Sequence, residues 1–456
     1  MKMNRRKFVA SAAAVAGAPA LHTGKGGPLG ANDRLICAFV GTGGMGRSNM
    51  RDFLRSGQVR AAAVCDVWDH NRDLTLQMTA DQEGGKAAGY TDFRQVLDLK
   101  EVDVVVVSTP DHWHALPTVM ACDAGKDVYV EKPLSLTIYE GRKMVDAARR
   151  NGRIVQMGTQ QRSGEHFQEA VKLVQEGAIG KVSRVNTWNY GNESPAGMGR
   201  PHDTEPPPGL DWDLWLGPAP KAPFNGNRFI HTFRWFWDYS GGMLTDWGTH
   251  HLDIVQWAMQ VDAPLAATAV GGNFCIDDNR ETPDTLEVLY EYPGFIASFS
   301  HRVGNARGPE GRGYGIEFFG TDGTLYLNRG GFEIRPETAG TAVAQRPRYL
   351  RMLDQKTPDR RRREWSSNEG RAGFRTAPGS EQHFNHVLNF LDCVRTRKKP
   401  ISDVEIGHRS TSTPHLGNIA LRLGRRIRWD GVKERVLGDD EANGLLHREY
   451  RKPWAL

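Results

Sequence analysis

The sequence predicts an α/β chain. Its first part is expected to form a parallel, doubly wound sheet, and its second part an α+β domain with a large, open, mainly antiparallel sheet. From Leu35 onward, short apolar runs rich in β-branched residues alternate with helical stretches, the pattern of parallel strands joined by helices. After residue 158 the pattern becomes one or two helices followed by several strands in series. The 456 residues are enough for both domains.

The first domain is expected over residues 34–157. Its strands are the short apolar runs, and its helices lie between them. We expect strands at 35–40, 60–65, 102–108, 127–131 and 153–157, and helices that include 45–56, 114–124 and 137–151.

The second domain is expected over residues 158–456. It begins with an amphipathic helix at 166–177 and a strand at 182–190. Residues 191–232 are rich in Pro, Gly, Trp and Asn, which favours a long ordered loop before a helix at 244–259. Further strands are expected at 265–275, 285–291, 295–303, 315–319 and 324–328, a polar irregular stretch at 340–380, and closing helices at 381–395 and 405–424.

The composition is that of an ordinary globular protein and excludes some classes of function. Hydrophobic residues make up 39% of the chain and charged residues 25%, and the net charge of +5 is too weak to indicate nucleic-acid binding. The densest basic run, Arg360 to Arg363, lies in a polar stretch and is typical of a solvated loop. The cysteines are scattered and predict neither a disulfide framework nor a thiolate metal site; they are Cys37, Cys65, Cys122, Cys275 and Cys393.

The N-terminus has the pattern of a twin-arginine export signal. The run Asn4-Arg5-Arg6-Lys7-Phe8 precedes an apolar stretch, Val9 to Ala20, that is too short to span a bilayer. Ala18-Pro19-Ala20 suits signal cleavage, and no cysteine nearby could carry a lipid. We therefore interpret residues 1–33 as the signal peptide and linker of a periplasmic protein, exported after folding and without a membrane anchor once the signal is cleaved. A cytoplasmic protein with a basic N-terminus is the alternative.

A glycine-rich loop follows the first strand. The glycines at 41, 43 and 46 have the G-x-G-x-x-G spacing of a dinucleotide-binding turn. The first permits the tight turn, the second lets the backbone approach a pyrophosphate, and the third lets the helix pack on the sheet. The N-terminus of that helix supplies free N–H groups for phosphate. The loop therefore predicts a Rossmann domain whose cofactor contacts include Gly41, Thr42, Gly43, Gly44, Met45 and Gly46.

Asp66 ends the second strand, 20 residues after Gly46. A carboxylate at this position accepts hydrogen bonds from both ribose hydroxyls and repels a 2′-phosphate, which favours NAD over NADP. Arg72 lies close enough downstream to leave NADP open, and a strand-end turn aspartate is the structural alternative for Asp66.

Two further strands end in polar residues at the sheet edge where open α/β sheets bind ligands. One strand leads to Thr109, Pro110, His112 and His114, and the next ends in Glu131 and Lys132. We interpret these six residues as cofactor contacts. We also interpret Lys132 as a substrate contact that stabilises oxygen charge during proton transfer. No metal is expected at the two histidines, because no cluster of Cys or carboxylates with ligand spacing accompanies them.

Asp246 and His250 lie four residues apart in the expected helix 244–259, and therefore share one helical face. A carboxylate near an imidazole can raise its basicity and orient it, which indicates an acid/base pair. Arg162, at the domain junction, and Trp235 and Tyr239 are candidates for the wall of a sugar pocket. Packing in the core is the alternative for the aromatic residues, because the chain has 12 tryptophans.

The glycine loop, Thr109-Pro110, Glu131-Lys132-Pro133 and the glycine pair that leads to Asp246 and His250 together resemble the Gfo/Idh/MocA oxidoreductases. The resemblance covers roughly residues 34–430. It implies a Rossmann domain followed by an α/β domain whose open sheet mediates homo-oligomerisation. It implies NAD, or NADP, as cofactor and a sugar, glycoside or polyol as substrate. It also implies that Lys132, Asp246 and His250 are catalytic, with the histidine as acid/base.

The expected reaction is hydride transfer from a CH–OH group to the nicotinamide. His250 would take the hydroxyl proton, Lys132 would bond the developing carbonyl oxygen, and Asp246 would orient the substrate or His250. Because free NAD is scarce outside the cytoplasm, an exported enzyme of this kind is expected to retain its nucleotide. Three alternatives stay open: glycoside cleavage through transient oxidation, as in NAD-dependent α-N-acetylgalactosaminidases; a cytoplasmic catabolic dehydrogenase; and a non-catalytic sugar-binding module.

Overall fold

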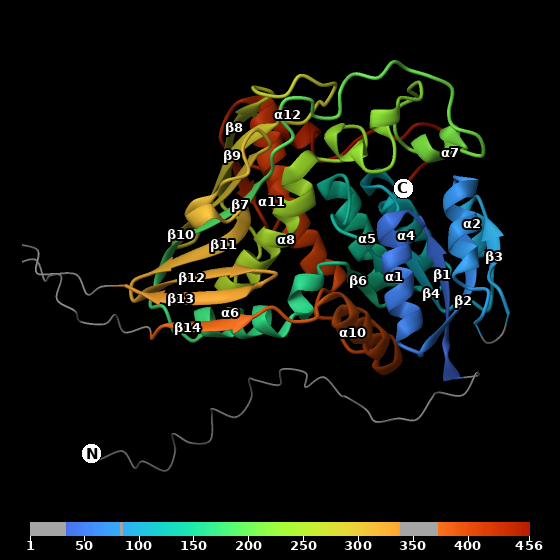
Figure 1. Ribbon diagram of the computed structural model, residues 1–456, viewed down its shortest axis with the longest axis horizontal. Helices are drawn as coiled ribbons and strands as arrows, with labels where there is room; N and C mark the ends of the chain where they lie inside the picture. The colour runs from blue at the N-terminus through green and yellow to red at the C-terminus, as the bar shows by residue number, and fades with distance from the viewer. Residues whose placement is uncertain (1–32, 83–84, 338–372) are drawn as a thin grey trace, which may run out of the picture.

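The structure is a computed structural model that describes residues 33–82, 85–337 and 373–456. The expected export signal and the basic run at Arg360 to Arg363 lie outside the described residues. Within the described part, no helix is both long and apolar enough to cross a membrane. The chain forms two sheets with helices between and around them (Figure 1).

The first sheet has the strand order β3-β2-β1-β4-β5-β6, and every neighbouring pair is parallel. This is the order of a doubly wound dinucleotide-binding sheet, in which the direction of winding reverses between β1 and β4. The carboxyl ends of β1, β4 and β5 therefore gather at one edge and bring the glycine loop, Thr109 and Lys132 together. The strands are β1 (Leu35–Val40), β2 (Val59–Cys65), β3 (Ala88–Tyr90), β4 (Val104–Val107), β5 (Asp127–Val130) and β6 (Val155–Met157).

Helices cover both faces of this sheet, and one of them comes from the end of the chain. α10 (His383–Thr396) packs beside α1 (Gly44–Arg55), and the ring of Phe390 meets Phe53 and Tyr129 edge to face with centroids 6.0 and 5.7 Å apart (Figure 1). The C-terminal segment also contributes, since Trp454 packs on Trp113. The remaining helices of this unit are α2 (Asp69–Gln77), α3 (Phe93–Leu97), α4 (Ala115–Asp123) and α5 (Ile138–Arg150).

The second sheet, as far as the described residues define it, has the order β14-β13-β12-β11-β7-β10-β9-β8-β15-β16. β7 and β10 are parallel, and the other pairs are antiparallel. The strands are β7 (Val182–Tyr190), β8 (Ala266–Gly272), β9 (Thr285–Tyr292), β10 (Phe295–Arg302), β11 (Tyr314–Gly320), β12 (Gly323–Asn328), β13 (Gly331–Pro336), β14 (Arg375–Pro378), β15 (Ile427–Asp430) and β16 (Arg435–Val436).

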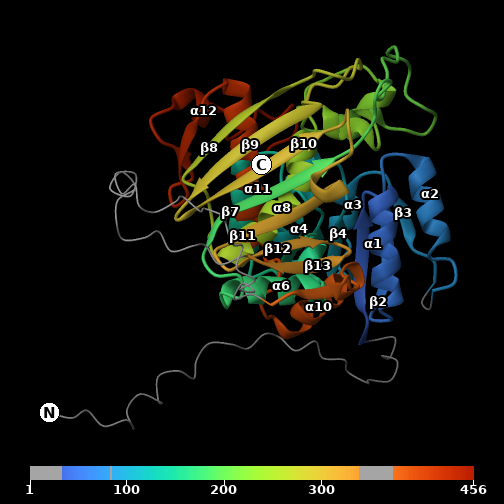
Figure 2. The same cartoon turned by 60° about the vertical axis from the view of Figure 1, so that its left-hand side comes forward.

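One face of this second sheet packs on α6 (Glu165–Gln175), α8 (Gly242–Met259) and α11 (Val404–Leu423), which share its hydrophobic core. No described helix covers the other face, and α8 and α11 lie behind the sheet in Figure 2. Most of α8 is buried because the sheet lies on one side of it and the first domain on the other (Figure 1). This position lets its first turns reach the edge where β5 ends.

The predicted fold class is confirmed, and the elements with long apolar patterns lie within a few residues of their predicted bounds. The missed elements are short or polar. β3 is only three residues with no apolar run, β14, β15 and β16 have two to four residues, and glycine and proline at the ends of β13 hide its alternation. The stretch 191–232 contains a short helix, α7 (Trp212–Leu216), and α12 (Asp440–Gly444) closes the second sheet.

Phe390→Ala is expected to destabilise the protein by about 3–5 kcal/mol, because it removes a fully buried ring that joins α10 to the first sheet. The midpoint of urea unfolding would measure the loss. Phe374→Ala is the matched control, because that ring is 69% exposed and its loss should change stability by less than about 0.5 kcal/mol. Similar effects of the two substitutions would show that α10 is not part of the first domain's core.

Candidate active site

The glycine loop has the backbone that a dinucleotide pyrophosphate needs. Gly41 has a φ of +79°, and a Cβ there would lie 2.6 Å from the amide nitrogen of Thr109. A Cβ on Gly46 would lie 2.0 Å from the carbonyl oxygen of Gly41. Gly44, by contrast, has no atom within 4 Å of such a Cβ, so the loop is open above the first turn of α1. No side chain caps this helix, whose N–H groups stay free for an anion.

Asp66 ties the glycine loop to the end of β2. Its Oδ2 accepts hydrogen bonds from the amide and hydroxyl of Thr42 at 2.7 and 3.1 Å, and its Oδ1 accepts one from the amide of Trp68 at 3.0 Å. Burial raises the pKa of this carboxyl, although these hydrogen bonds oppose the rise. Oδ1 keeps a free lone pair for a ribose hydroxyl, a contact that remains a prediction. Arg72 is already bound by Asp69 at 2.6 Å.

The residues after β4 hold the sheet edge in place. The two ring nitrogens of His114 lie 2.6 Å from the carbonyl oxygen of Pro133 and 2.8 Å from that of Thr109, so this ring joins the ends of β4 and β5. His112 lies 3.0 Å from the carbonyl oxygen of Trp215, and burial lowers its pKa to about 3. Pro110 precedes the turn that carries His112. Among the described residues, no group of His, Cys, Asp and Glu is arranged to hold a metal.

Glu131 points into the protein and fixes the direction of Lys132. Its carboxylate accepts hydrogen bonds from Asn49 and Gln160, both at 3.0 Å, and from the amide of Lys132 at 3.2 Å. Burial raises the pKa of this carboxyl. Because Glu131 is held by α1 and by the turn after β6, the lysine side chain leaves the strand on the other side, towards α8.

Lys132 and Asp246 form an ion pair that joins β5 to α8. Asp246 also lies 3.4 Å from the guanidinium nitrogen Nε of Arg234. Burial opposes the charge on this carboxyl, but the Lys132 and Arg234 charges outweigh burial and hold its pKa well below the usual range. The expectation that Asp246 raises the basicity of His250 is wrong here, because the carboxylate is bound to Lys132 and Arg234 and the pKa of His250 is lowered.

His250 is buried one turn further along α8 and has an unexpected neighbour, Arg329. The Nη2 of Arg329 lies 3.3 Å from Nε2 of His250, so this ring nitrogen accepts and the proton of the neutral ring sits on Nδ1. Burial, together with the Lys132 and Arg329 charges, lowers the pKa of His250 well below its usual value. Arg329 follows β12, 79 residues beyond His250, and no local pattern marks it.

The other candidates for the sugar pocket lie in the packed interior. Arg162 is paired with Asp253, with Nε 2.7 Å from Oδ2, and stacks over Trp257. Trp235 and Tyr239 are 5% and 0% exposed and belong to the aromatic cluster of the 210–239 segment. In this structure the polar groups or rings of these three residues are covered by protein, and their contact with substrate stays a prediction.

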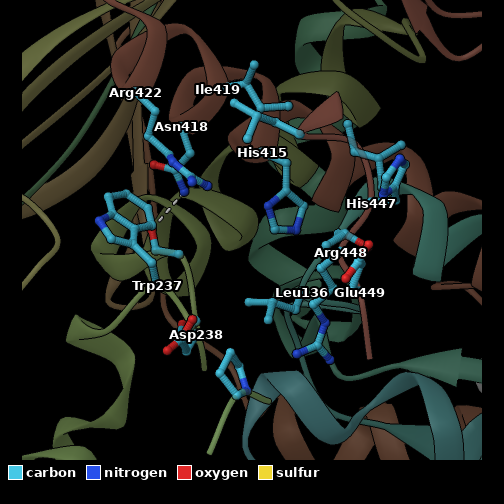
Figure 3. Close-up of a pocket in the computed structure, with 16 residues that line it drawn as sticks. Leu136, Trp237, Asp238, His415, Asn418, Ile419, Arg422, His447, Arg448 and Glu449 are labelled. Atoms are coloured by element: carbon cyan, nitrogen blue, oxygen red, sulfur yellow. Dashed lines mark hydrogen bonds between the residues drawn. The ribbon is translucent and has the colours of Figure 1, made fainter. Parts of the chain in front are cut away.

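A separate cavity of about 370 Å³ borders the segments that lead into α8 and α5 (Figure 3). Asn418 donates a hydrogen bond to the carbonyl oxygen of Gly241 at 2.9 Å, drawn as a dashed line, while its own side-chain oxygen has no partner. Lys132, Asp246 and His250 do not line this cavity. Its walls are residues 136–138, 220, 237, 238, 240, 241, 415, 418, 419, 422, 445 and 447–449.

Comparison with known proteins matches both halves of the chain. The profile of the Gfo/Idh/MocA oxidoreductase family, NAD-binding Rossmann fold, matches residues 35–159, and the profile of that family's C-terminal alpha/beta domain matches 163–277 and 375–456. Glycosyl hydrolase family 109 protein 1 of Shewanella sp. strain MR-4 is 30% identical over 148 residues, and the alpha-N-acetylgalactosaminidase of Shewanella oneidensis is 29% identical over 148 residues. Each alignment covers 32% of this chain and 32% of the relative, about a third of its length.

Solved structures share the fold at low sequence identity. The WlbA dehydrogenase of Chromobacterium violaceum, in complex with NADH and UDP-GlcNAcA, superposes with a TM-score of 0.61 at 18% identity, over 89% of this chain and 99% of that one. The aldose-aldose oxidoreductase of Caulobacter crescentus, complexed with glycerol, gives a TM-score of 0.60 at 22% identity, over 87% and 99%. The open glycine loop fits the NAD that the matching profile implies.

Gly46→Ala is expected to destabilise the protein by about 1–3 kcal/mol or more, because the new Cβ would collide with the backbone of Gly41. Gly44→Ala, two residues earlier in the same helix, meets no atom and serves as the matched control. Thermal unfolding of both variants, followed by circular dichroism, checks the difference. Equal melting temperatures would contradict the close contact between α1 and β1.

Proposed function

The chain belongs to the NAD-binding Gfo/Idh/MocA oxidoreductases, and from that premise we propose that it oxidises a CH–OH group of a sugar, glycoside or polyol. One observation carries the proposal: Lys132, paired with Asp246, and His250 come together at the sheet edge where the glycine loop would present a nucleotide. Bound NAD would supply the hydride acceptor.

The protein groups divide the proton chemistry between them. His250 is neutral at physiological pH because its pKa is low, so it can accept the hydroxyl proton of the substrate. Lys132, held by Asp246, donates a hydrogen bond to the substrate oxygen and stabilises charge that develops there. Asp246 is then a positioning residue for Lys132 rather than for His250. Glu131 accepts a hydrogen bond from the amide of Lys132 and so fixes the position of the lysine backbone relative to the glycine loop.

Export and nucleotide retention belong to the same proposal. The twin-arginine pattern supports a periplasmic location for an enzyme that folds around its nucleotide first. Without a supply of free NAD, such an enzyme must regenerate the nucleotide through a second substrate or within one catalytic cycle. The open face of the second sheet exposes Leu289 and Ile296 at 49% and 50%, which supports a homo-oligomer built on this face.

Glycoside cleavage through transient oxidation is the second candidate. It is favoured by the relatives named glycosyl hydrolase family 109 protein and alpha-N-acetylgalactosaminidase, which match about a third of the chain. The same His250 and Lys132 would serve both reactions, because both begin with removal of a hydride and a proton. The reactions differ in their outcome: oxidation leaves reduced nucleotide or a reduced second substrate, whereas cleavage restores the nucleotide.

The pH dependence of kcat/KM is expected to report the low pKa of His250. A general base must be deprotonated, so activity falls only below its pKa, and a lowered pKa keeps kcat/KM flat as pH falls from 8 to about 6.5. His250→Asn should reduce kcat by about 10²- to 10⁴-fold. His202→Asn, at an exposed histidine, is the control. A wild-type profile already half lost at or above pH 6.5 would contradict the assignment.

Retention and reaction type are tested on the mature protein purified without added nucleotide. We expect denaturation to release NAD or NADH, because the nucleotide is held through export. A panel of sugars and aryl glycosides is then added, and absorbance at 340 nm follows the bound nucleotide. Stable reduction indicates oxidation, and product release without reduction indicates cleavage. A supernatant free of nucleotide would rule out retention.

A further inference from the structure

Arg329 places a positive charge beside His250, and no described carboxylate forms an ion pair with it. Its guanidinium lies 4.7 Å over the ring of Trp247, and its Nη2 faces His250. Its Nε is buried, and no described group forms a hydrogen bond with it. Within residues 33–82, 85–337 and 373–456, no Asp or Glu forms an ion pair with it. Burial lowers the pKa of this guanidinium, the direction expected for a poorly compensated charge.

Three other arginines with mostly covered side chains are paired with carboxylates. Arg162 binds Asp253 at 2.7 Å, Arg280 binds Asp278 at 2.7 Å, and Arg448 binds Glu140 at 2.8 Å. Leaving a buried charge without a partner costs folding free energy, which is why the others are neutralised internally. Arg329 has no such carboxylate among the described residues, which is informative about what the site binds.

The charges around the site indicate that the missing partner of Arg329 is an anion. Lys132, Arg234 and Arg329 bring three cations towards the site, and in the part of the chain that the structure describes only Asp246 pairs with any of them. Glu131 is turned away, towards Asn49. A substrate therefore meets an excess of positive charge next to the nitrogen that would accept its proton.

We propose that Arg329 is an anion subsite of the substrate pocket and that the substrate is a carbohydrate that carries a carboxylate. The inference rests on the proposed function, since it names the class of sugar that the same site oxidises. A guanidinium binds a carboxylate through two parallel hydrogen bonds, and the free Nε together with one Nη offers that geometry. A neutral sugar leaves the cation unpaired, so it is selected against.

Carboxylate binding also prepares the base. In the free protein Arg329 donates to Nε2 of His250 and occupies the lone pair that must accept the substrate proton. A carboxylate that draws the guanidinium to itself frees this lone pair and neutralises the charge that disfavours an imidazolium. Arg329 thus couples recognition of the anionic group to activation of His250, and it is a specificity-determining residue for the reaction.

The test compares the full mature protein with Arg329→Gln and Arg329→Lys. Arg335→Gln is the matched control, because it removes one charge from the neighbouring strand β13, where Arg335 is exposed and paired with Glu333. The probes are D-glucuronate and D-galacturonate against D-glucose and D-galactose, with D-glucose 6-phosphate as a separate arm. Titration calorimetry measures affinity, and the intrinsic tryptophan fluorescence, to which Trp247 beneath the guanidinium contributes, gives a second readout.

We expect wild type to bind at least one of the two uronates tenfold or more tightly than the matching neutral sugar. Arg329→Gln should weaken uronate binding by about 10- to 100-fold, the effect of losing hydrogen bonds to a charged group, and should leave neutral sugars unchanged. Arg329→Lys keeps the charge but cannot form two parallel hydrogen bonds to a carboxylate, so its affinity for uronates should fall several-fold. If Arg329→Gln fails to fold, the proposal is tested with Arg329→Lys alone.

Three results would overturn the subsite: equal affinity of wild type for uronates and neutral sugars, no saturable uronate binding, or tight binding of the phosphate sugar alone. The proposed function fails separately. Selective uronate binding without nucleotide reduction or glycoside cleavage would support the anion subsite and contradict the proposed oxidation. Nucleotide reduction by neutral sugars alone would leave the oxidation and remove the subsite.

Discussion

The ion pair between Lys132 and Asp246 is the contact on which the rest of the site depends. It crosses from the end of a strand in the first domain to the second turn of a helix in the other, and both side chains are mostly buried, at 18% and 15% exposure. A charge at this depth needs its partner, because removing one member leaves the other uncompensated. The pair therefore fixes both the direction of the lysine and the approach of α8 to the first sheet.

The environment of His250 follows from that approach. Because α8 packs between the second sheet and the first domain, His250 is shielded from water and lies near two cations. Both effects favour the neutral ring, which is the form that a base needs. The low basicity of such a ring would by itself limit proton transfer. A bound anion neutralises the Arg329 charge and so raises the basicity of His250. Substrate selectivity and reactivity therefore have the same electrostatic origin.

Much of the site could be predicted because each part is local in sequence. The glycine loop, the residues after β4 and β5, and the Asp246/His250 pair each lie within one strand end or one helical turn. The partners of these groups could not be predicted. Arg329 contacts His250 from a hairpin that lies 79 residues further along the chain. Arg162 pairs with Asp253, from which it is separated by 91 residues in sequence. Such pairings depend on how α8 packs against the second sheet and the domain junction, which periodicity does not encode. The same holds for Trp235 and Tyr239, whose aromatic character suits a core as well as a sugar pocket.

The return of α10 to the first sheet has a consequence for the order in which the protein folds. Phe390 and its neighbours complete a core whose other members are encoded within the first 130 residues. During synthesis, the first domain therefore keeps an apolar face exposed until α10 has been made. The core of the first domain is therefore complete only once residues 383–396 are available, unlike that of a domain built from one continuous segment. An apolar face that stays exposed for that long is a site at which the growing chain can aggregate.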